Sequence, residues 1–246
     1  MSARLKTGAD DSLVRMTENQ STGFRPTGTP DVRDAAVDFA MLEPREQLRV
    51  LLRDHVVGKP FSELNAVTFD HRAAAVMGHV MLDALEDAGY SVDDFDAVGA
   101  LTAAAVPLVS AMIQAAASRG EDLDGFVMDF VYPSIKGPSI KNRRVVLVDA
   151  WLSEKSYVQT SSLVTLRNGN ELSLDFGVVD AQGAEVVAIT SLVGGVGESA
   201  RPAGSANAAG SANSADVATI AVVNPVTDEQ HALPFVPVFD ESELSA

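Results

Sequence analysis

Side chains that could bind a small ligand follow an apolar segment near the middle of the chain. The apolar run 145–148 ends on Asp149. Three further polar side chains come soon after it: Ser153, Lys155 and Ser156. An uninterrupted Val/Leu run is typical of a strand buried on both faces of a parallel sheet. Ligands bind beyond the carboxyl ends of such strands, so we expect the loop 149–157 to line any small-molecule site.

A second group of candidates is basic, and it lies just before the same strand: Lys136, Lys141, Arg143 and Arg144. Such a cluster can hold a phosphate group or an acidic surface of a partner. It is also typical of a solvated entry to a strand, and we favour this simpler interpretation.

Metal chemistry has little support in the sequence. His71 and His79 are eight residues apart, whereas two metal ligands on one helix face are usually four apart. Asp93, Asp94 and Asp96 could hold a cation, but the glycine and glutamate of a calcium loop are absent, which favours a solvated loop. No glycine-rich dinucleotide-binding or P-loop motif occurs, and a chain without cysteine has no disulfides or thiolate nucleophiles.

Alternating helices and strands must position these side chains. Apolar periodicity predicts helices over 42–55, 69–89 and 103–118, and apolar runs predict strands over 96–102, 125–131, 145–148 and 184–193. Strands that alternate with helices indicate an α/β protein with a mostly parallel central sheet flanked by helices.

One segment, 161–176, interrupts this alternation. Two alternating runs flank Asn168-Gly169-Asn170, which predicts an inserted hairpin. A helix with Leu172 and Phe176 on one face is the alternative, and the hairpin is slightly favoured.

Composition divides the chain into four parts. Residues 1–36 are rich in small and polar residues and are expected to form a disordered leader, followed by the α/β domain over 37–196. Residues 197–216 are typical of a flexible Gly/Ala/Ser/Asn linker. Residues 217–246 are expected to pack back on the domain, with a strand at 217–223. The two prolines in 233–239 favour an edge strand or no strand there.

The charge of the chain limits its partners. The formal net charge of −16 repels nucleic-acid phosphates and anionic membranes, so we expect neither as a partner. No apolar stretch is long enough for a transmembrane helix, and the N-terminus has no apolar core of a secretory signal. A cytoplasmic location is the expectation.

The order of these segments resembles the orotate phosphoribosyltransferases, in particular the short bacterial form. The resemblance covers 46–194 and, more weakly, the end of the chain. It is carried by the segments 68–72, 96–107 (DAVGALTAAAVP), 123–127, 136–149, 183–189 and 233–244. It implies a type I phosphoribosyltransferase fold, a homodimer and a role in pyrimidine nucleotide metabolism. Such enzymes displace pyrophosphate from phosphoribosyl pyrophosphate (PRPP) with Mg²⁺.

The resemblance also assigns site residues, and the family pattern is altered at three of them. Asp149 keeps one carboxylate of an acidic pair whose second member is replaced by Ala150. The phosphate cradle corresponds to 153–157 (SEKSY), where a required glycine is missing and Glu154 adds negative charge. The mobile basic loop corresponds to 129–134 (DFVYPS), which has no Lys, Arg or His.

Smaller features complete the comparison with the family pattern. Lys59 and Thr102 match positions on the substrate side. Asp149 could bind ribose, although a role in starting the loop is favoured. Trp151 and Tyr157 bring bulk that would fill a phosphate-sized space.

Simultaneous change at three catalytic elements favours a protein that has lost phosphoribosyl transfer. It would bind a nucleotide-like ligand or a protein partner, with no catalytic residue and no metal. One alternative is an active phosphoribosyltransferase for orotate or a related base, in which Lys155 and the cluster 136–144 replace the basic loop. Only this alternative requires PRPP and Mg²⁺. The other is a structural or assembly protein in which the hairpin and the tails make new contacts.

Overall fold

The computed structural model describes residues 38–59, 64–129, 134–153, 164–167, 171–174, 177–195, 217–223 and 230–245. The expected leader and linker, 1–36 and 197–216, lie outside them. The chain divides into two compact units, Met1–Met41 and Leu42–Ala246. In the first unit only 38–41 are described, and there the Met41 N–H donates to the Asp38 carbonyl at 3.2 Å. Within the described residues, no helix is both long and apolar enough to cross a membrane.

The three long helices of the second unit match those predicted from the sequence. They are α2 (Pro44–Val56), α4 (His71–Asp87) and α5 (Val106–Arg119). The Asp70 side chain caps α4 by accepting from the Arg72 N–H at 2.8 Å. Gly120, with φ of 78°, ends α5 in a left-handed conformation. Short helical turns complete the set: α3 (Asn65–Thr68), η2 (Val92–Asp94), η3 (Ala103–Ala105), α6 (Gly177–Asp180) and α7 (Glu241–Leu244).

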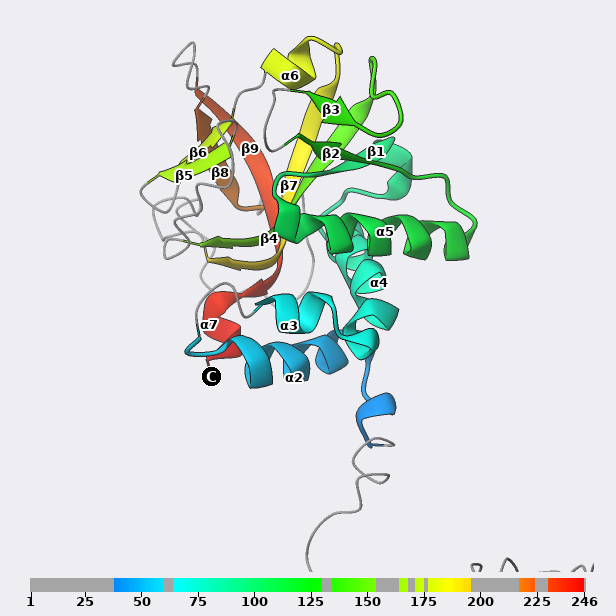
Figure 1. Cartoon of the computed structure of the whole chain (residues 1–246), viewed down its shortest axis with the longest axis vertical. Helices are drawn as coiled ribbons and strands as arrows, with labels where there is room; N and C mark the ends of the chain where they lie inside the picture. Colours follow the sequence, from blue (N-terminus) through cyan, green and yellow to red (C-terminus); the bar gives the residue numbers. More distant parts are fainter. Residues whose placement is uncertain are drawn as a thin grey trace, which may run out of the picture. The chain divides into compact units, whose positions relative to one another are not determined.

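The described strands form one sheet in the order β3-β2-β1-β4-β7-β9-β8-β6-β5 (Figure 1). Their bounds are β1 (Ala97–Ala100), β2 (Asp124–Met128), β3 (Ile135–Lys136), β4 (Arg144–Ser153), β5 (Val164–Arg167), β6 (Glu171–Leu174), β7 (Glu185–Gly195), β8 (Thr219–Val223) and β9 (Gln230–Asp240). The central pairs β2–β1, β1–β4, β4–β7 and β7–β9 are all parallel. The expected α/β fold with a mostly parallel central sheet is therefore confirmed.

Both faces of the central strands are buried. The side chains of 145–148 are all 0% exposed, which confirms the prediction from the apolar run. The helix α5 packs on β1, β2 and β4, and α4 packs on β7, β9 and α5 (Figure 1). At the crossing of the two helices, a Cβ on Gly78 would lie 2.1 Å from the Ala111 carbonyl oxygen. Glycine is therefore what allows α4 and α5 to approach this closely.

The inserted hairpin is confirmed, and the helix alternative is wrong for the paired residues. The strands β5 and β6 pair antiparallel, with Val164 opposite Leu174 and Arg167 opposite Glu171. β6 then pairs with β8, so the hairpin extends the sheet at its far edge.

The prediction for the proline-containing segment 233–239 is wrong, because β9 lies inside the sheet. Residues 230–234 pair with β8 and residues 235–240 pair with β7. Each half of β9 thus forms ladder hydrogen bonds along one edge only. A proline, which has no N–H, can occupy a position where that N–H would face the other edge. Pro234 and Pro237 fit an interior strand for this reason.

Candidate functional site

The strand β4 continues beyond the point where the sequence predicted a loop. It runs through Ser153, with Trp151 opposite Val193 and Ser153 opposite Gly195 on β7. Ala150, Trp151 and Leu152 are 0%, 8% and 4% exposed. The expected loop is therefore wrong for 149–153. The reason is that β7 also extends, through the glycines 194 and 195, and provides a partner for these apolar residues.

The candidates Lys155 and Ser156 lie outside the described residues. So do Glu154 and Tyr157. Ser153 is described as the last residue of β4. These positions therefore remain predictions.

Two predicted site residues, Thr102 and Asp149, are in contact. Thr102 follows β1, Asp149 lies on the neighbouring β4, and the Thr102 hydroxyl donates to Asp149 Oδ1 at 2.7 Å. The two side chains are 1% and 3% exposed. The Ala150 N–H also donates to Asp149 Oδ1, at 2.6 Å. Asp149 does not start a loop; its carboxylate satisfies backbone donors of β4 beyond the end of β1.

Burial dominates the electrostatics of Asp149. It raises the pKa of this carboxyl to about 6, because the charged form loses its hydration. The Thr102 hydroxyl and the N–H groups of Ala150 and Trp151 act in the opposite direction by stabilising the carboxylate. The group is thus a buried acid held by its own chain, and it is not displayed to solvent.

The candidate Lys59 makes its contact elsewhere. It lies in the turn after α2, and its Nζ donates to the Asp54 carbonyl at 3.1 Å. A lysine at the end of a helix stabilises the last carbonyl groups. The described contacts therefore give Lys59 a capping role and do not join it to the pair of Thr102 and Asp149.

The two described ends of the segment 129–134, which follows β2 and precedes β3, contact each other. The Asp129 N–H donates to the Ser134 carbonyl at 2.8 Å, and Lys136 Nζ lies 3.6 Å from Asp129 Oδ2. Only residues 130–133, outside the described part, separate the two ends.

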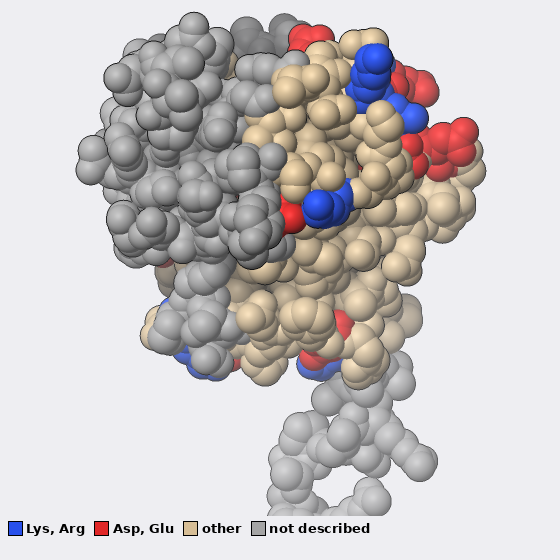
Figure 2. Space-filling model, turned by 45° about the horizontal axis from the view of Figure 1, so that its top comes forward, with Lys and Arg blue, Asp and Glu red and all other residues tan. Residues whose placement is uncertain are grey.

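The basic cluster does not converge on one point. Arg143 pairs with Asp124, Arg144 Nη2 donates to the Asp93 carbonyl at 2.8 Å, and Lys136 pairs with Asp129. On the face shown in Figure 2, basic and acidic side chains lie next to each other and form no separate basic patch. This supports the simpler interpretation of the cluster.

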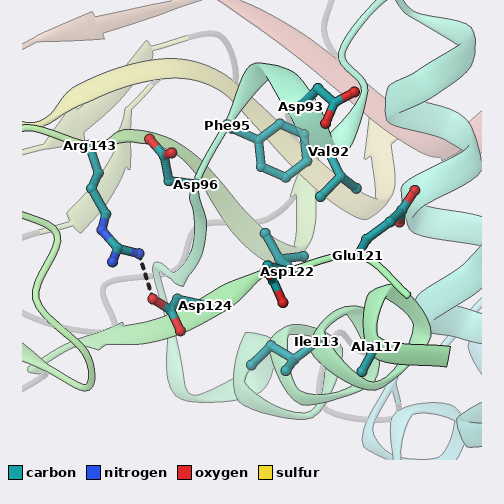
Figure 3. A pocket seen from close by; sticks show the side chains of 11 residues that line it. Val92, Asp93, Phe95, Asp96, Ile113, Ala117, Glu121, Asp122, Asp124 and Arg143 are labelled. Atoms are coloured by element: carbon teal, nitrogen blue, oxygen red, sulfur yellow. Dashed lines mark hydrogen bonds and ion pairs between the residues drawn. The ribbon is translucent and has the colours of Figure 1, made fainter. Parts of the chain in front are cut away.

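A cavity of about 700 Å³ lies at the opposite end of the sheet from Asp149. Its lining includes residues at the amino ends of three parallel strands: Asp96, Asp124 and Arg143. Figure 3 shows Arg143 facing Asp124 at one end, with Phe95 in the middle and Glu121 on the other side. This cavity was not predicted from the sequence, because three separate segments form it and its candidates Asp93, Asp96 and Arg143 belonged to two unrelated groups.

Two acidic residues near this cavity, Asp94 and Asp96, are engaged with the protein itself, whereas a buried carboxylate oxygen of Glu121 has no hydrogen-bond partner among the described residues. Asp94 Oδ2 accepts from the N–H and the hydroxyl of Ser91, at 2.9 and 2.7 Å, and Asp96 Oδ2 accepts from the Arg144 N–H at 2.8 Å. Among the described residues, no group of three His, Asp or Glu side chains could hold a metal ion. Asp93, Asp94 and Asp96 are exposed, which agrees with the solvated segment favoured from the sequence.

Comparison with known proteins identifies orotate phosphoribosyltransferases among the relatives of this chain. The chain is 35% identical to the orotate phosphoribosyltransferase of Streptomyces avermitilis over 169 residues, which are 66% of this chain and 82% of that protein. It is 35% identical to the enzyme of the same name from Streptomyces coelicolor over 151 residues, 59% of this chain and 72% of that protein. No family model matches the chain.

A solved structure shows the same fold. The crystal structure of Mycobacterium tuberculosis H37Rv orotate phosphoribosyltransferase in complex with PRPP matches with a TM-score of 0.50 and 22% identity. The match covers 83% of this chain and 94% of that one. At this identity the match establishes the architecture, and the chemistry must be argued from the residues present.

Proposed function

The chain belongs to the orotate phosphoribosyltransferase family, and we propose that it has lost phosphoribosyl transfer and acts by binding a nucleotide-like ligand or a protein partner. The observation that supports this most is the continuation of β4, which is buried at 150–152 and paired with β7 through Ser153. Transfer would need an open phosphate cradle directly after this strand, at 153–157.

A phosphate cradle consists of backbone N–H groups that point at the anion, usually in a glycine-rich turn or at a helix N-terminus. Here the residues 151–153 are paired with β7. The N–H groups of Ala150 and Trp151 donate to Asp149. These donors, which precede the cradle positions 153–157, are therefore already used by the protein, and the carboxylate beside them would repel a phosphate.

The acidic residue of the family pattern is also in an unfavourable position for a ligand. Asp149 is 3% exposed and accepts hydrogen bonds from its own chain. Ala150, in the second acidic position, has no polar side chain. Ribose hydroxyls would have to reach a buried carboxylate whose Oδ1 already accepts from Thr102 and Ala150.

Neutralisation of the leaving pyrophosphate requires positive charge close to the reaction. The connection 129–134 has no basic residue and is closed by the hydrogen bond between Asp129 and Ser134. Lys136, the nearest basic residue in sequence, pairs with Asp129. This element therefore supports the same proposal independently of β4.

The direct test is an assay of the purified protein with PRPP, Mg²⁺ and a panel of purine and pyrimidine bases including orotate. The Streptomyces avermitilis relative, assayed in parallel, is the positive control. We expect no release of pyrophosphate above background from this chain. Turnover well above background with any base would contradict the proposal.

Retained transfer is the second candidate, because the chain is 35% identical to proteins named as the active enzyme. Lys155 and the basic residues of 136–144 would then supply the missing charge. An active enzyme must bind PRPP, and at a concentration 100-fold above Kd binding adds about 2.7 kcal/mol to stability. A thermal shift with millimolar PRPP and Mg²⁺ would favour this candidate, whereas an unchanged Tm would count against it.

A further inference from the structure

The cavity of about 700 Å³ at the amino ends of β1, β2 and β4 has a strongly acidic lining. Its charged side chains are five carboxylates and one guanidinium: Asp93, Asp96, Glu121, Asp122, Asp124 and Arg143. Arg143 pairs with Asp124, and no second basic residue lines the cavity to balance the other four carboxylates. The volume is within the usual range of small-molecule sites, about 300–1,000 Å³.

One of these carboxylates has an oxygen that lacks a donor. Glu121 follows α5, and its Oε2 atom is buried without a hydrogen-bond partner among the described residues. Figure 3 shows this side chain at the end of the cavity away from the pair of Arg143 and Asp124. A carboxylate oxygen that is buried without a donor loses its hydration and gains nothing in exchange. A cationic N–H group in the cavity would supply the missing donor.

Apolar side chains complete the lining. Phe95 and Leu123 are buried, and Val92, Ile113 and Ala117 line the cavity with them. In Figure 3, Phe95 and Val92 lie on one side of the cavity, and Ile113 and Ala117 lie on the opposite side. Walls of this kind contact the hydrocarbon part of a ligand, while a few polar groups fix its orientation. The lining therefore suits an organic cation with an aliphatic chain.

The carboxylates are spread around the cavity and do not converge on one point (Figure 3). Within the described part of the chain, no three His, Asp or Glu side chains are placed to hold a metal ion. A divalent metal ion needs several oxygen ligands at about 2–2.6 Å from one centre. A linear amine, in contrast, carries its positive charges several bonds apart. The spacing of the charges thus favours a polyamine over a metal ion.

We propose that this cavity binds a small linear polyamine. One ammonium group donates to Glu121 Oε2, a second lies at the exposed carboxylate of Asp93, and the aliphatic chain contacts Ile113 and Leu123. The site lies at the opposite end of the sheet from Asp149. The inference therefore goes beyond the proposed function and holds whether or not the protein transfers phosphoribosyl groups.

Calorimetric titration of the full chain with spermidine at low ionic strength tests the proposal, with Mg²⁺ titrated in parallel. We expect one saturable site for spermidine and no comparable site for Mg²⁺. Spermidine binding that does not saturate would overturn the proposal. So would Mg²⁺ binding that spermidine displaces and that is equally sensitive to the variants below, because the cavity would then hold any cation.

Variants separate this site from general attraction, because a net charge of −16 draws polycations to the whole surface. The double variant Glu121→Gln/Asp93→Asn removes two charges from the cavity and should weaken spermidine binding at least about tenfold. Glu43→Gln/Asp54→Asn removes two exposed charges at α2, outside the lining, and should leave the affinity within about twofold. Equal weakening by both double variants would overturn the proposal.

A single substitution guards against a folding defect in the double variant. Asp93→Asn alone changes an exposed side chain, and the Tm without ligand should match that of the wild type. It should still weaken spermidine binding, whereas the single control Asp54→Asn should not. Wild-type affinity in a folded Asp93→Asn variant would contradict the placement of the second ammonium group.

Discussion

The contact between Thr102 and Asp149 places a carboxylate where burial opposes its charge. Because the folded-state pKa of Asp149 is raised to about 6 from the usual 3.8, the folded protein keeps this proton after the unfolded chain has lost it. The stability that this group contributes is therefore present below pH 4 and is lost as the pH rises through 6. The difference of about 2 units corresponds to about 3 kcal/mol.

The first prediction compares the wild type with Asp149→Asn, which cannot ionise. Between pH 4 and pH 7.5 the free energy of unfolding of the wild type should fall by about 3 kcal/mol relative to the variant. Urea unfolding followed by fluorescence of Trp151, the only tryptophan, measures this. The exposed Asp122→Asn variant is the control and should follow the wild type. Parallel curves for wild type and Asp149→Asn would contradict the burial of this charge.

The second prediction concerns the hydroxyl group that supports this carboxylate. Thr102→Val removes the donor and keeps the shape of the side chain, so it should cost about 1.5–3 kcal/mol at pH 8, where Asp149 is charged. At pH 4 the cost should be smaller, because a neutral carboxyl needs the donor less. Thr102→Ser keeps the hydroxyl and should recover most of the loss. Equal costs for Val and Ser at pH 8 would show that the hydroxyl contributes nothing.

At the scale of elements, the close crossing of α4 and α5 depends on Gly78. Alanine in a helix interior is usually about 1 kcal/mol more stable than glycine. Here the new Cβ would meet the backbone of Ala111, which cannot rotate away. We therefore expect Gly78→Ala to lower the free energy of unfolding by about 1–3 kcal/mol, against the usual trend. Thermal unfolding measures it, with a substitution at the exposed Ala75 as control.

Apolar burial and ion pairing both occur where α7 and the end of β9 meet α2, and two substitutions can separate their contributions to stability. Glu243 lies 3.6 Å from Arg45 and 3.5 Å from Arg49, at the surface, whereas Phe239 is fully buried beneath the same arginines. Phe239→Ala should cost about 3–5 kcal/mol. Glu243→Gln should cost less than about 1 kcal/mol, because exposed ion pairs contribute little. The reverse order in denaturant unfolding would mean that charge holds this helix.

Local sequence patterns predicted most elements but not how far two strands extend. The helices and the buried run 145–148 follow from periodicity alone. The extension of β4 was missed because it depends on β7, whose end, Gly194-Gly195, is typical of a turn. The structure explains this glycine: a Cβ on Gly194 would lie 2.6 Å from Pro237 Cβ and 2.8 Å from the Phe235 ring. The close approach of β9 requires glycine at position 194, and this requirement cannot be recognised in the sequence of β7 alone.

The candidate site could also be predicted only in part from local sequence patterns. Thr102 ends one predicted strand and Asp149 directly follows another, and the carboxyl ends of parallel strands lie along one edge of a sheet, which makes their contact understandable. The burial and the raised pKa of the Asp149 carboxyl could not be predicted, because they depend on the continuation of β4 after Asp149. The cavity at the amino ends combines three segments that no local pattern connects.

At the scale of the whole molecule, the position of β9 makes the C-terminal segment part of the core. β9 lies between β7 and β8, and with α7 it buries five apolar side chains: Phe235, Val236, Val238, Phe239 and Leu244. At about 1.5–3 kcal/mol each, their burial contributes on the order of 10 kcal/mol. This is comparable to the entire stability of a typical domain, about 5–15 kcal/mol.

The last prediction follows from this comparison. A chain of residues 37–196, the boundaries that composition suggests for the main domain, should not unfold cooperatively, and it should bind a hydrophobic dye through its uncovered β7. Adding residues 217–246 as a separate peptide should restore a cooperative transition, since β9 and α7 supply the missing layer in trans. A peptide with Phe235 and Phe239 changed to serine is the matched control and should fail to do so. Cooperative unfolding of 37–196 alone would show that the inner sheet is complete without β9, which would contradict the role given to the C-terminal segment.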